Sequence, residues 1–121
     1  MMDAQLTTDN QGRRVAIRGC ESPCAIERGM RVLGGKWTGS ILWHLKDGPV
    51  RFNDLSRMVA GASKKILSER LQHLQAAGLV TRTLRDTAPP SVEYALTAQG
   101  RTALGFLETL KDWSETHLPQ G

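Results

Sequence analysis

The segment between Ser63 and Gly78 places the strongest constraint on how this chain can fold. Leu67, Leu71 and Leu74 fall within about 60° of one another on a helical wheel of this segment. The spacing predicts a helix with one buried stripe, which Ser63 caps at its start and Gly78 ends. The opposite side of the same helix carries lysine, serine, glutamate and glutamine, so we expect that side to face solvent or a binding partner.

Shorter helices are predicted before this segment, over residues 23–33, 36–46 and 52–59, where apolar residues recur three or four positions apart. After Gly78 the period changes. The stretches "LVTRTLR" and "SVEYALT" are β-prone, and the prolines of the intervening "DTAPP" suit a loop. We therefore expect a β-hairpin over residues 79–96.

A last helix is predicted over residues 97–116, where Leu104, Leu107, Leu110 and Trp113 form an apolar stripe. This stripe is longer than one small core requires, which leaves apolar surface for a second contact. The order of four helices, a hairpin and a final helix predicts a mainly α fold with a small β-hairpin.

Residues 52–77 form a candidate helix-turn-helix, and the hairpin after it makes this a winged helix-turn-helix of the three-helical, DNA- or RNA-binding type. We expect one domain over residues 21–118, with the wing over residues 79–96. Residues 1–20 carry few large apolar side chains and no periodicity, so they are predicted to form a flexible arm.

Positive charge is concentrated in the part of the chain that holds these elements. The whole chain has a net charge of +4, and residues 49–85 alone carry seven basic and two acidic residues, which gives +5 there and −1 over the remainder. A positive field confined to one part of a small domain suits a phosphate backbone. Double-stranded DNA is the predicted partner, although lysines and arginines scattered on a solvated face would give a similar count.

The predicted DNA contacts follow from the geometry of a helix-turn-helix. The leucine stripe anchors the second helix and forces its opposite face outward, where a major groove can receive it, while residues at the positive end of the helix dipole suit phosphates. Basic residues that flank the wing suit the DNA backbone or the minor groove. The predicted contact residues are Ser63, Lys64, Lys65, Ser68, Glu69, Gln72, Arg51, Arg82 and Arg85.

The sequence argues against several other classes of protein. Apolar runs fall short of the roughly 18 residues that span a bilayer, and the N-terminus lacks the apolar block of a secretory signal, so we expect a cytoplasmic protein without a membrane partner. Cys20 and Cys24 have no second pair, which favours a reducing compartment. His44, His73 and His117 are scattered, and no zinc spacing, phosphate-binding glycine loop or nucleophile elbow occurs. We therefore expect neither an enzyme nor a metal or cofactor site.

Five fragments of the chain are typical of one bacterial family: "CAIERGMRVLGGKW", "GPVRFNDL", "ASKKILSERLQHLQAAGLVTR", "PPSVEYALTAQG" and "LKDW". On these fragments the chain resembles the HxlR-type winged-helix transcription regulators, which are related to MarR regulators. The resemblance implies a homodimer whose first and last helices, residues 23–33 and 97–116, form most of the interface, and two recognition helices that read a near-palindromic operator. The interface residues that it implies are Ile26, Met30, Leu104, Leu107, Leu110 and Trp113.

The resemblance also implies a chemical switch. Several family members sense electrophiles, quinones or oxidants through a cysteine at the start of the first helix, and Cys24 falls at that position, although Pro23 precedes it where the family usually has proline after it. A thiol in the first helical turn lies near unpaired N–H groups, which favour the reactive thiolate. We expect a repressor that releases DNA when Cys24 is oxidised or alkylated, with Cys20 as a resolving thiol. Either cysteine can instead be a small buried apolar residue.

Two alternatives share the same fold. In the first, Trp37, Trp43, Phe52 and Phe106 line a pocket near the dimer interface for an apolar or aromatic effector, and ligand binding replaces thiol chemistry. In the second, the winged helix is a protein-interaction module without DNA binding, and its affinity for duplex DNA does not fall steeply with salt.

Overall fold

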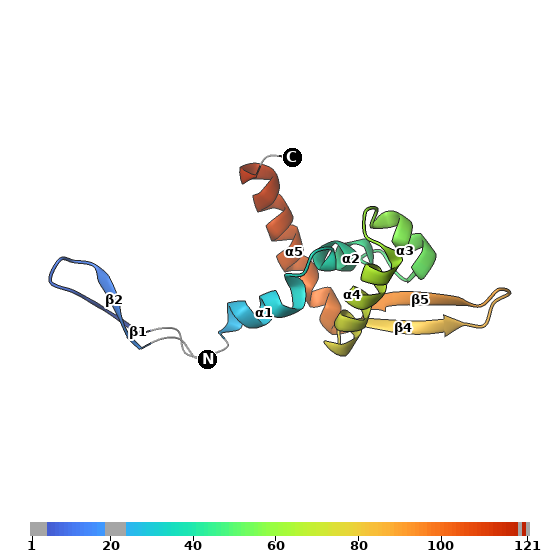
Figure 1. Ribbon diagram of the computed structural model, residues 1–121, viewed down its shortest axis with the longest axis horizontal. Helices are drawn as coiled ribbons and strands as arrows, with labels where there is room; N and C mark the ends of the chain where they lie inside the picture. The colour runs from blue at the N-terminus through green and yellow to red at the C-terminus, as the bar shows by residue number, and fades with distance from the viewer. Residues whose placement is uncertain (1–4, 19–23, 119, 121) are drawn as a thin grey trace.

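The structure, a computed structural model, describes residues 5–18, 24–118 and 120 of the 121 in the chain. α3 and α4 form the helix-turn-helix, and β4 and β5 form the wing, which confirms the predicted winged helix-turn-helix fold (Figure 1). The elements, in order, are β1 (Gln5–Thr8), β2 (Arg14–Arg18), α1 (Ala25–Leu33), α2 (Thr38–His44), β3 (Val50–Arg51), α3 (Phe52–Met58), α4 (Lys64–Ala76), β4 (Val80–Arg85), β5 (Ser91–Leu96) and α5 (Ala98–His117).

The core lies where the leucine stripe of α4 meets α2 and α3. Leu67, Leu71 and Leu74 are completely buried, as their helical spacing predicted. Burial of an aliphatic side chain of this size contributes roughly 1.5–3 kcal/mol, so these contacts hold α4 in one orientation. The other residues of the core are Ile41, Leu42, Leu45, Leu55, Val59, Leu79, Val80, Tyr94 and Leu107.

Both ends of α4 are formed by the residues that the sequence indicated. The Oγ atom of Ser63 accepts a hydrogen bond from the backbone N–H of Ile66 at 3.1 Å. Gly78 follows the helix with a φ of 80°, a left-handed conformation that glycine adopts without steric cost. The chain then returns to the helix through a hydrogen bond from the N–H of Leu79 to the carbonyl oxygen of Leu74 at 3.0 Å.

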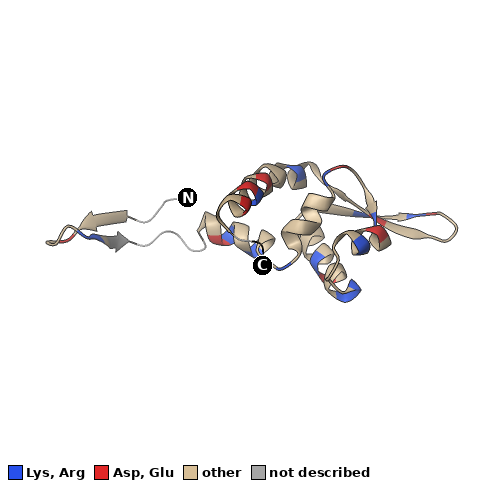
Figure 2. Cartoon of the chain, turned by 90° about the horizontal axis from the view of Figure 1, so that it is seen from above, with Lys and Arg blue, Asp and Glu red and all other residues tan. Residues whose placement is uncertain are grey.

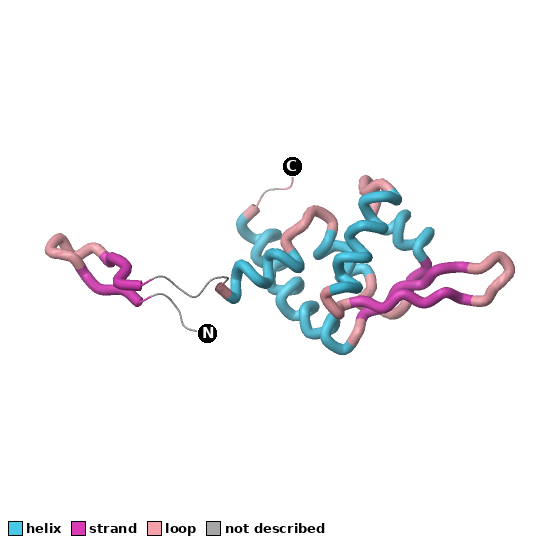
Figure 3. Tube along the Cα trace, turned by 60° about the horizontal axis from the view of Figure 1, so that its bottom comes forward, coloured by secondary structure: helices cyan, strands magenta, loops and turns pink. Residues whose placement is uncertain are grey.

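The wing belongs to a three-stranded antiparallel sheet in the order β3-β5-β4. The sequence predicted β4 and β5 but not β3, because a strand of two residues is too short to show alternation. Val50 of β3 pairs with Tyr94 of β5, and Arg51 pairs with Glu93. The residues just before α3 are therefore joined to the base of the wing. Figure 3 shows the long strands running past α4 to the loop at the wing tip.

Thr97 connects the wing to α5 and is the N-cap residue of that helix. Its Oγ1 atom donates a hydrogen bond to the carbonyl oxygen of Gly78 at 2.7 Å and accepts one from the backbone N–H of Gly100 at 2.9 Å. Gly100 lies so close to β4 that a Cβ atom there would be 2.1 Å from the carbonyl oxygen of Leu79. The first turn of α5 therefore packs directly against the backbone that follows α4.

Two predicted helices start later than expected. α1 begins at Ala25 and not at residue 23, because Cys24 is extended, with a ψ of 164°. α2 begins at Thr38 and not at residue 36, because Trp37 has a positive φ of 76° that interrupts a right-handed helix.

Residues 5–18 form a β-hairpin, which the sequence did not predict within the arm. Asp9 holds its turn, since Oδ1 accepts hydrogen bonds from the N–H groups of Gln11 and Arg13 at 2.9 and 2.8 Å. Gly12 supplies the positive φ of 80° in the same turn. Because polar side chains and a glycine form this turn, the sequence offered no hydrophobic periodicity from which to predict the hairpin. The hairpin lies apart from the helices in Figures 1 and 3, and the flexibility of the arm stays a prediction.

Candidate nucleic-acid interface

The outer face of α4 is open. Lys65, Glu69 and Gln72 are exposed opposite the buried leucines, as predicted, and Ser68 is half-buried at the edge of this face. Lys64, in the first turn, is exposed as well. A helix face that presents ammonium, carboxylate and amide groups has the donors and acceptors that pair with base edges in a major groove.

A groove between α4 and the wing brings four of the predicted residues together. Its walls contain Ser68 and Gln72 from α4, Arg82 from β4 and Arg51 from β3. Residues 87–92, at the tip of the wing, complete it. Hydrogen-bond donors from separate elements thus line one concave surface, which suits a phosphodiester strand that passes between the helix and the wing.

Four further polar residues from α3 and α4 line this groove and were missed from the sequence: Asn53, Asp54, Arg57 and Gln75. Asn53 and Arg57 lie four residues apart on the side of α3 opposite the buried Leu55, so their spacing was the signal that could have found them. Gln75 continues the polar row of α4 by one turn. Arg57 also forms an ion pair with Asp54 on α3.

The groove remains positive after this ion pair is counted. Asp54 offsets the charge of Arg57, whereas neither Arg51 nor Arg82 forms an ion pair within the part of the chain that the structure describes. Acidic residues gather instead on the C-terminal half of α5 (Figure 2). The charge distribution therefore directs a polyanion to the groove.

The wing arginines lie on opposite faces of the sheet. Arg82 borders the groove, whereas Nη2 of Arg85 donates a hydrogen bond to Oε1 of Glu93 at 2.8 Å. This bond is the largest effect on the Glu93 carboxyl and lowers its pKa; desolvation, the next largest effect, opposes it, and the charges of Arg85 and Arg51 lower the pKa further. The same bond raises the pKa of the Arg85 guanidinium. The predicted DNA contact Arg85 therefore already has a carboxylate partner.

The recognition helix, the wing and the positive groove between them match the kind of protein to which this chain is similar. The HxlR-like helix-turn-helix family matches residues 32–121. The chain belongs to this family. YybR of Bacillus subtilis, described as an HTH-type transcriptional regulator, is 37% identical over 94 residues, which are 78% of this chain and 75% of YybR.

Solved structures of similar proteins agree with the membership in the HxlR-like family. A MarR-family transcriptional regulator from Porphyromonas gingivalis W83 has a TM-score of 0.77 and 28% identity, and the match covers 82% of this chain and 97% of that one. The redox regulator HypR in its oxidised form has a TM-score of 0.75 and 36% identity over 80% of this chain and 100% of HypR. The HxlR-like chain is therefore a DNA-binding transcriptional regulator of the helix-turn-helix type.

α1 and α5 of this HxlR-like regulator expose apolar side chains that were predicted for a dimer interface. Ile26 and Met30 on α1 are 75% and 52% exposed. Leu110 and Trp113 on α5 are 44% and 52% exposed. Side chains of this size lose favourable burial when they face water, so both helices offer surface for a partner.

The same prediction was wrong for Leu107, which is 8% exposed and lies in the core of the protomer beside Gly39 of α2. Leu104 is partly buried against the same core. The reason is that α5 packs on α2 with its first half, so the apolar stripe of α5 is divided between the protomer core and the free surface.

Cys24 is the N-cap residue of α1, one position before the helical turn in which it was predicted. It is half-buried, and its side chain makes no capping hydrogen bond. Its backbone carbonyl accepts the N–H of Arg28 at 3.0 Å, which is the first hydrogen bond of the helix. Cys20 lies outside the described residues, so its pairing with Cys24 stays a prediction.

The aromatic residues considered for an effector pocket are mostly part of the core. Trp37, Trp43 and Phe52 pack against the buried cluster, and Phe106 is 49% exposed on α5. Phe52 also borders the groove beside α4.

Over residues 5–18 and 24–118, no cluster of three histidine, cysteine or acidic side chains is arranged to bind a metal ion. Within the same ranges, no helix has the length and apolar character needed to cross a membrane. The expected lack of a cofactor and of catalytic activity stays a prediction.

Proposed function

We propose that this HxlR-like regulator is a homodimeric repressor that reads a near-palindromic operator through two copies of α4. The observation that carries the proposal is the positive groove between α4 and the wing, next to a polar helix face that three completely buried leucines hold outward. An element fixed in this way binds DNA without first rearranging.

Base contacts are assigned to the exposed face of α4. The ammonium group of Lys65 can donate to guanine O6 or N7, and the amide of Gln72 can form two hydrogen bonds with adenine. Glu69 can accept a hydrogen bond from the amino group of cytosine. These residues therefore supply sequence preference.

Phosphate contacts are assigned to the start of α4, to the groove and, for Arg85, to the other face of the wing. The oxygen of Ser63 is engaged by the N–H of Ile66, but its own hydroxyl proton remains free to donate to a phosphate. Guanidinium groups in the groove can each contact phosphate with two N–H donors. The proposed phosphate contacts are Ser63, Lys64, Ser68, Arg51, Arg57, Arg82 and Arg85.

The dimer is proposed because α1 and α5 leave large apolar side chains in water. A second copy that buries them under two-fold symmetry would bind successive major grooves if its recognition helix lies about 34–36 Å from the first, one turn of DNA. A change at this interface alters that spacing and so weakens operator binding.

The switch is assigned to Cys24. HypR, to which the chain is similar, is a redox regulator, and Cys24 lies at the start of α1 close to the proposed interface. A peroxide would convert the Cys24 thiolate to sulfenic acid, because one peroxide oxygen is transferred to sulfur and hydroxide leaves. A second thiol, Cys20 or Cys24 of the partner subunit, would then displace water and form a disulfide.

DNA binding is tested by fluorescence anisotropy with duplexes selected from a random library, over a series of salt concentrations. Lys65→Ala is expected to weaken binding by about 1–3 kcal/mol for the preferred sequence, and affinity should fall steeply with salt. Lys111→Ala is the matched control, because this lysine pairs with Glu115 on α5 and lies outside the groove. A flat response to salt would favour the protein-interaction module instead.

A further inference from the structure

Charged side chains form a row on the face of the sheet that carries Glu93, opposite to the face of Arg82, and Arg51 at one end of this row also borders the groove. Glu93 on the central strand β5 pairs with Arg51 of β3 on one side and with Thr83 of β4 on the other. Arg85 lies two residues beyond Thr83 on the same face and donates to Glu93 at 2.8 Å. The row therefore runs from Arg51 through Glu93 to Arg85.

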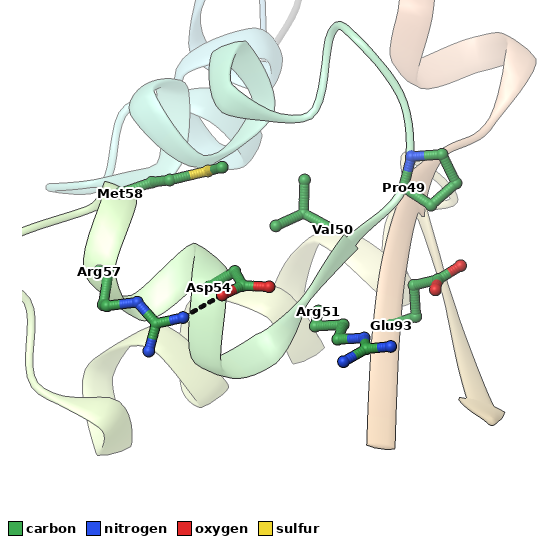
Figure 4. A pocket seen from close by; sticks show the side chains of 7 residues that line it. All are labelled: Pro49, Val50, Arg51, Asp54, Arg57, Met58 and Glu93. Carbon is green, nitrogen blue, oxygen red and sulfur yellow. Dashed lines mark hydrogen bonds and ion pairs between the residues drawn. The ribbon is translucent and has the colours of Figure 1, made fainter. Parts of the chain in front are cut away.

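The carboxylate of Glu93 is partly withdrawn from water, since its side chain is 19% exposed. Arg51 and Glu93 also border a hollow beside α3, together with the ion pair of Asp54 and Arg57 (Figure 4). Each carboxylate of this surface thus lies among arginines, and the arginines outnumber the carboxylates. The hollow shares Arg51, Asp54 and Arg57 with the groove, so the two are continuous at the edge formed by β3.

We propose that Glu93 is a positioning residue for DNA binding. It orients Arg85 along the wing through their hydrogen bond and attracts Arg51 from the neighbouring strand β3, so that both guanidinium groups meet the phosphate backbone. The inference rests on the proposed function of the groove. The inference adds Glu93 to the residues that support DNA binding. The sequence did not assign this residue, and its negative charge is opposite to that expected of a DNA contact.

Two effects of Glu93 oppose each other. Its negative charge repels phosphates, and salt screens this repulsion over about 8–10 Å. Its hydrogen bond restricts the rotamers of Arg85 before DNA arrives, so less side-chain entropy is lost on binding. A guanidinium has five N–H donors, and donors that are not engaged by Glu93 remain available to a phosphate. The arginine therefore keeps donors for DNA, and the proposal requires the positioning effect to exceed the repulsion.

The sign of the effect provides the test. Glu93→Gln removes a negative charge, so electrostatics alone predicts tighter binding to a mixed-sequence DNA duplex, whereas positioning predicts binding that is weaker by about three- to tenfold. The matched control is Glu115→Gln, which loses an ion pair of the same length, 2.8 Å, on α5. This control is expected to leave affinity unchanged or slightly improved.

Glu93→Asp and a double-mutant cycle with Arg85 separate positioning from charge and from folding. Glu93→Asp keeps the charge but shortens the side chain, so it should weaken binding as well. In an Arg85→Ala background, Glu93→Gln should cause little further loss, because its main partner is already absent. Thermal unfolding of each variant, measured alongside, shows whether the wing is intact.

Unchanged or tighter binding by Glu93→Gln overturns the inference, and so does an equal loss in the presence and absence of Arg85. If the unaltered protein does not bind any duplex, the proposed function fails together with the inference. If the unaltered protein binds and the Glu93 variants match it, only the inference fails.

Discussion

The Nε2 atom of His73 lies 3.2 Å from the carbonyl oxygen of Val32, which joins the recognition helix α4 to the end of α1. One turn earlier, Nε of Arg70 donates to the carbonyl oxygen of Lys36 at 3.0 Å. His73 is exposed on α4, and its ring nitrogen faces the end of α1. Because α1 has no buried residue of its own, the hydrogen bond of His73 helps to fix its end against α4, while that of Arg70 holds the connection between α1 and α2.

His73→Ala is expected to lower the free energy of unfolding by about 0.5–1.5 kcal/mol, because the Val32 carbonyl loses its partner. Urea denaturation measures the change. His73→Gln, whose amide can still donate, should retain most of the stability. Equal stability of the alanine and glutamine variants would show that the contact contributes nothing.

Leu71→Ala is expected to destabilise the fold by about 2–5 kcal/mol, because it opens a cavity beneath α4. Leu84→Ala is the matched control, since Leu84 is 66% exposed on the wing and its truncation removes little buried surface. Urea unfolding curves of the two variants are compared by their midpoints, provided that the dependence of the unfolding free energy on urea concentration is the same for both. Similar losses for both leucines would contradict the position of the core.

Leu110→Glu and Trp113→Glu are expected to convert the proposed dimer to a monomer without unfolding it, because they place charges on the exposed half of α5. Sedimentation velocity measures the oligomeric state. Gln99→Glu, at the exposed start of α5, should leave the dimer intact. Leu107→Ala should instead lower the stability of the protomer, since Leu107 is in the core.

Cys24→Ser is expected to bind its selected duplex as tightly as the unaltered protein and to keep that duplex when hydrogen peroxide or a quinone is added. The unaltered protein should release it, and a reductant should restore binding after peroxide if a disulfide has formed. Release of DNA by the serine variant would exclude Cys24 as the switch and favour an effector that binds without thiol chemistry.

The ion pair of Arg85 and Glu93 should make a contribution to stability that depends on pH. Because the pKa of Glu93 is below its ordinary value of 4.5 in the folded protein, the contribution is fully present above pH 4.5 and is lost as pH falls through the lowered pKa. Denaturation between about pH 7 and pH 3 should therefore show a difference between the unaltered protein and Glu93→Gln that shrinks on acidification. A constant difference would mean that the pair does not stabilise the wing.

Some features of the protein could be predicted from short stretches of its sequence. The leucine stripe of α4, the caps Ser63 and Thr97 and the two long wing strands are determined by residues within a few positions of one another. Periodicity and capping are local properties, because they depend on the geometry of a single helix or strand. The outward face of α4, and with it most of the proposed base contacts, followed from the same local rule.

Other features depended on elements that are distant in the sequence. The short strand β3 exists because β5 offers it a pairing edge, and Leu107 is buried because α5 crosses α2. Arg57 lines the groove because α3 packs beside α4 and the wing. The partner of Arg85 is Glu93, eight residues away on the adjacent strand. Which faces meet, and therefore which charges become neighbours, is set by the packing of whole elements and not by the spacing within any one of them.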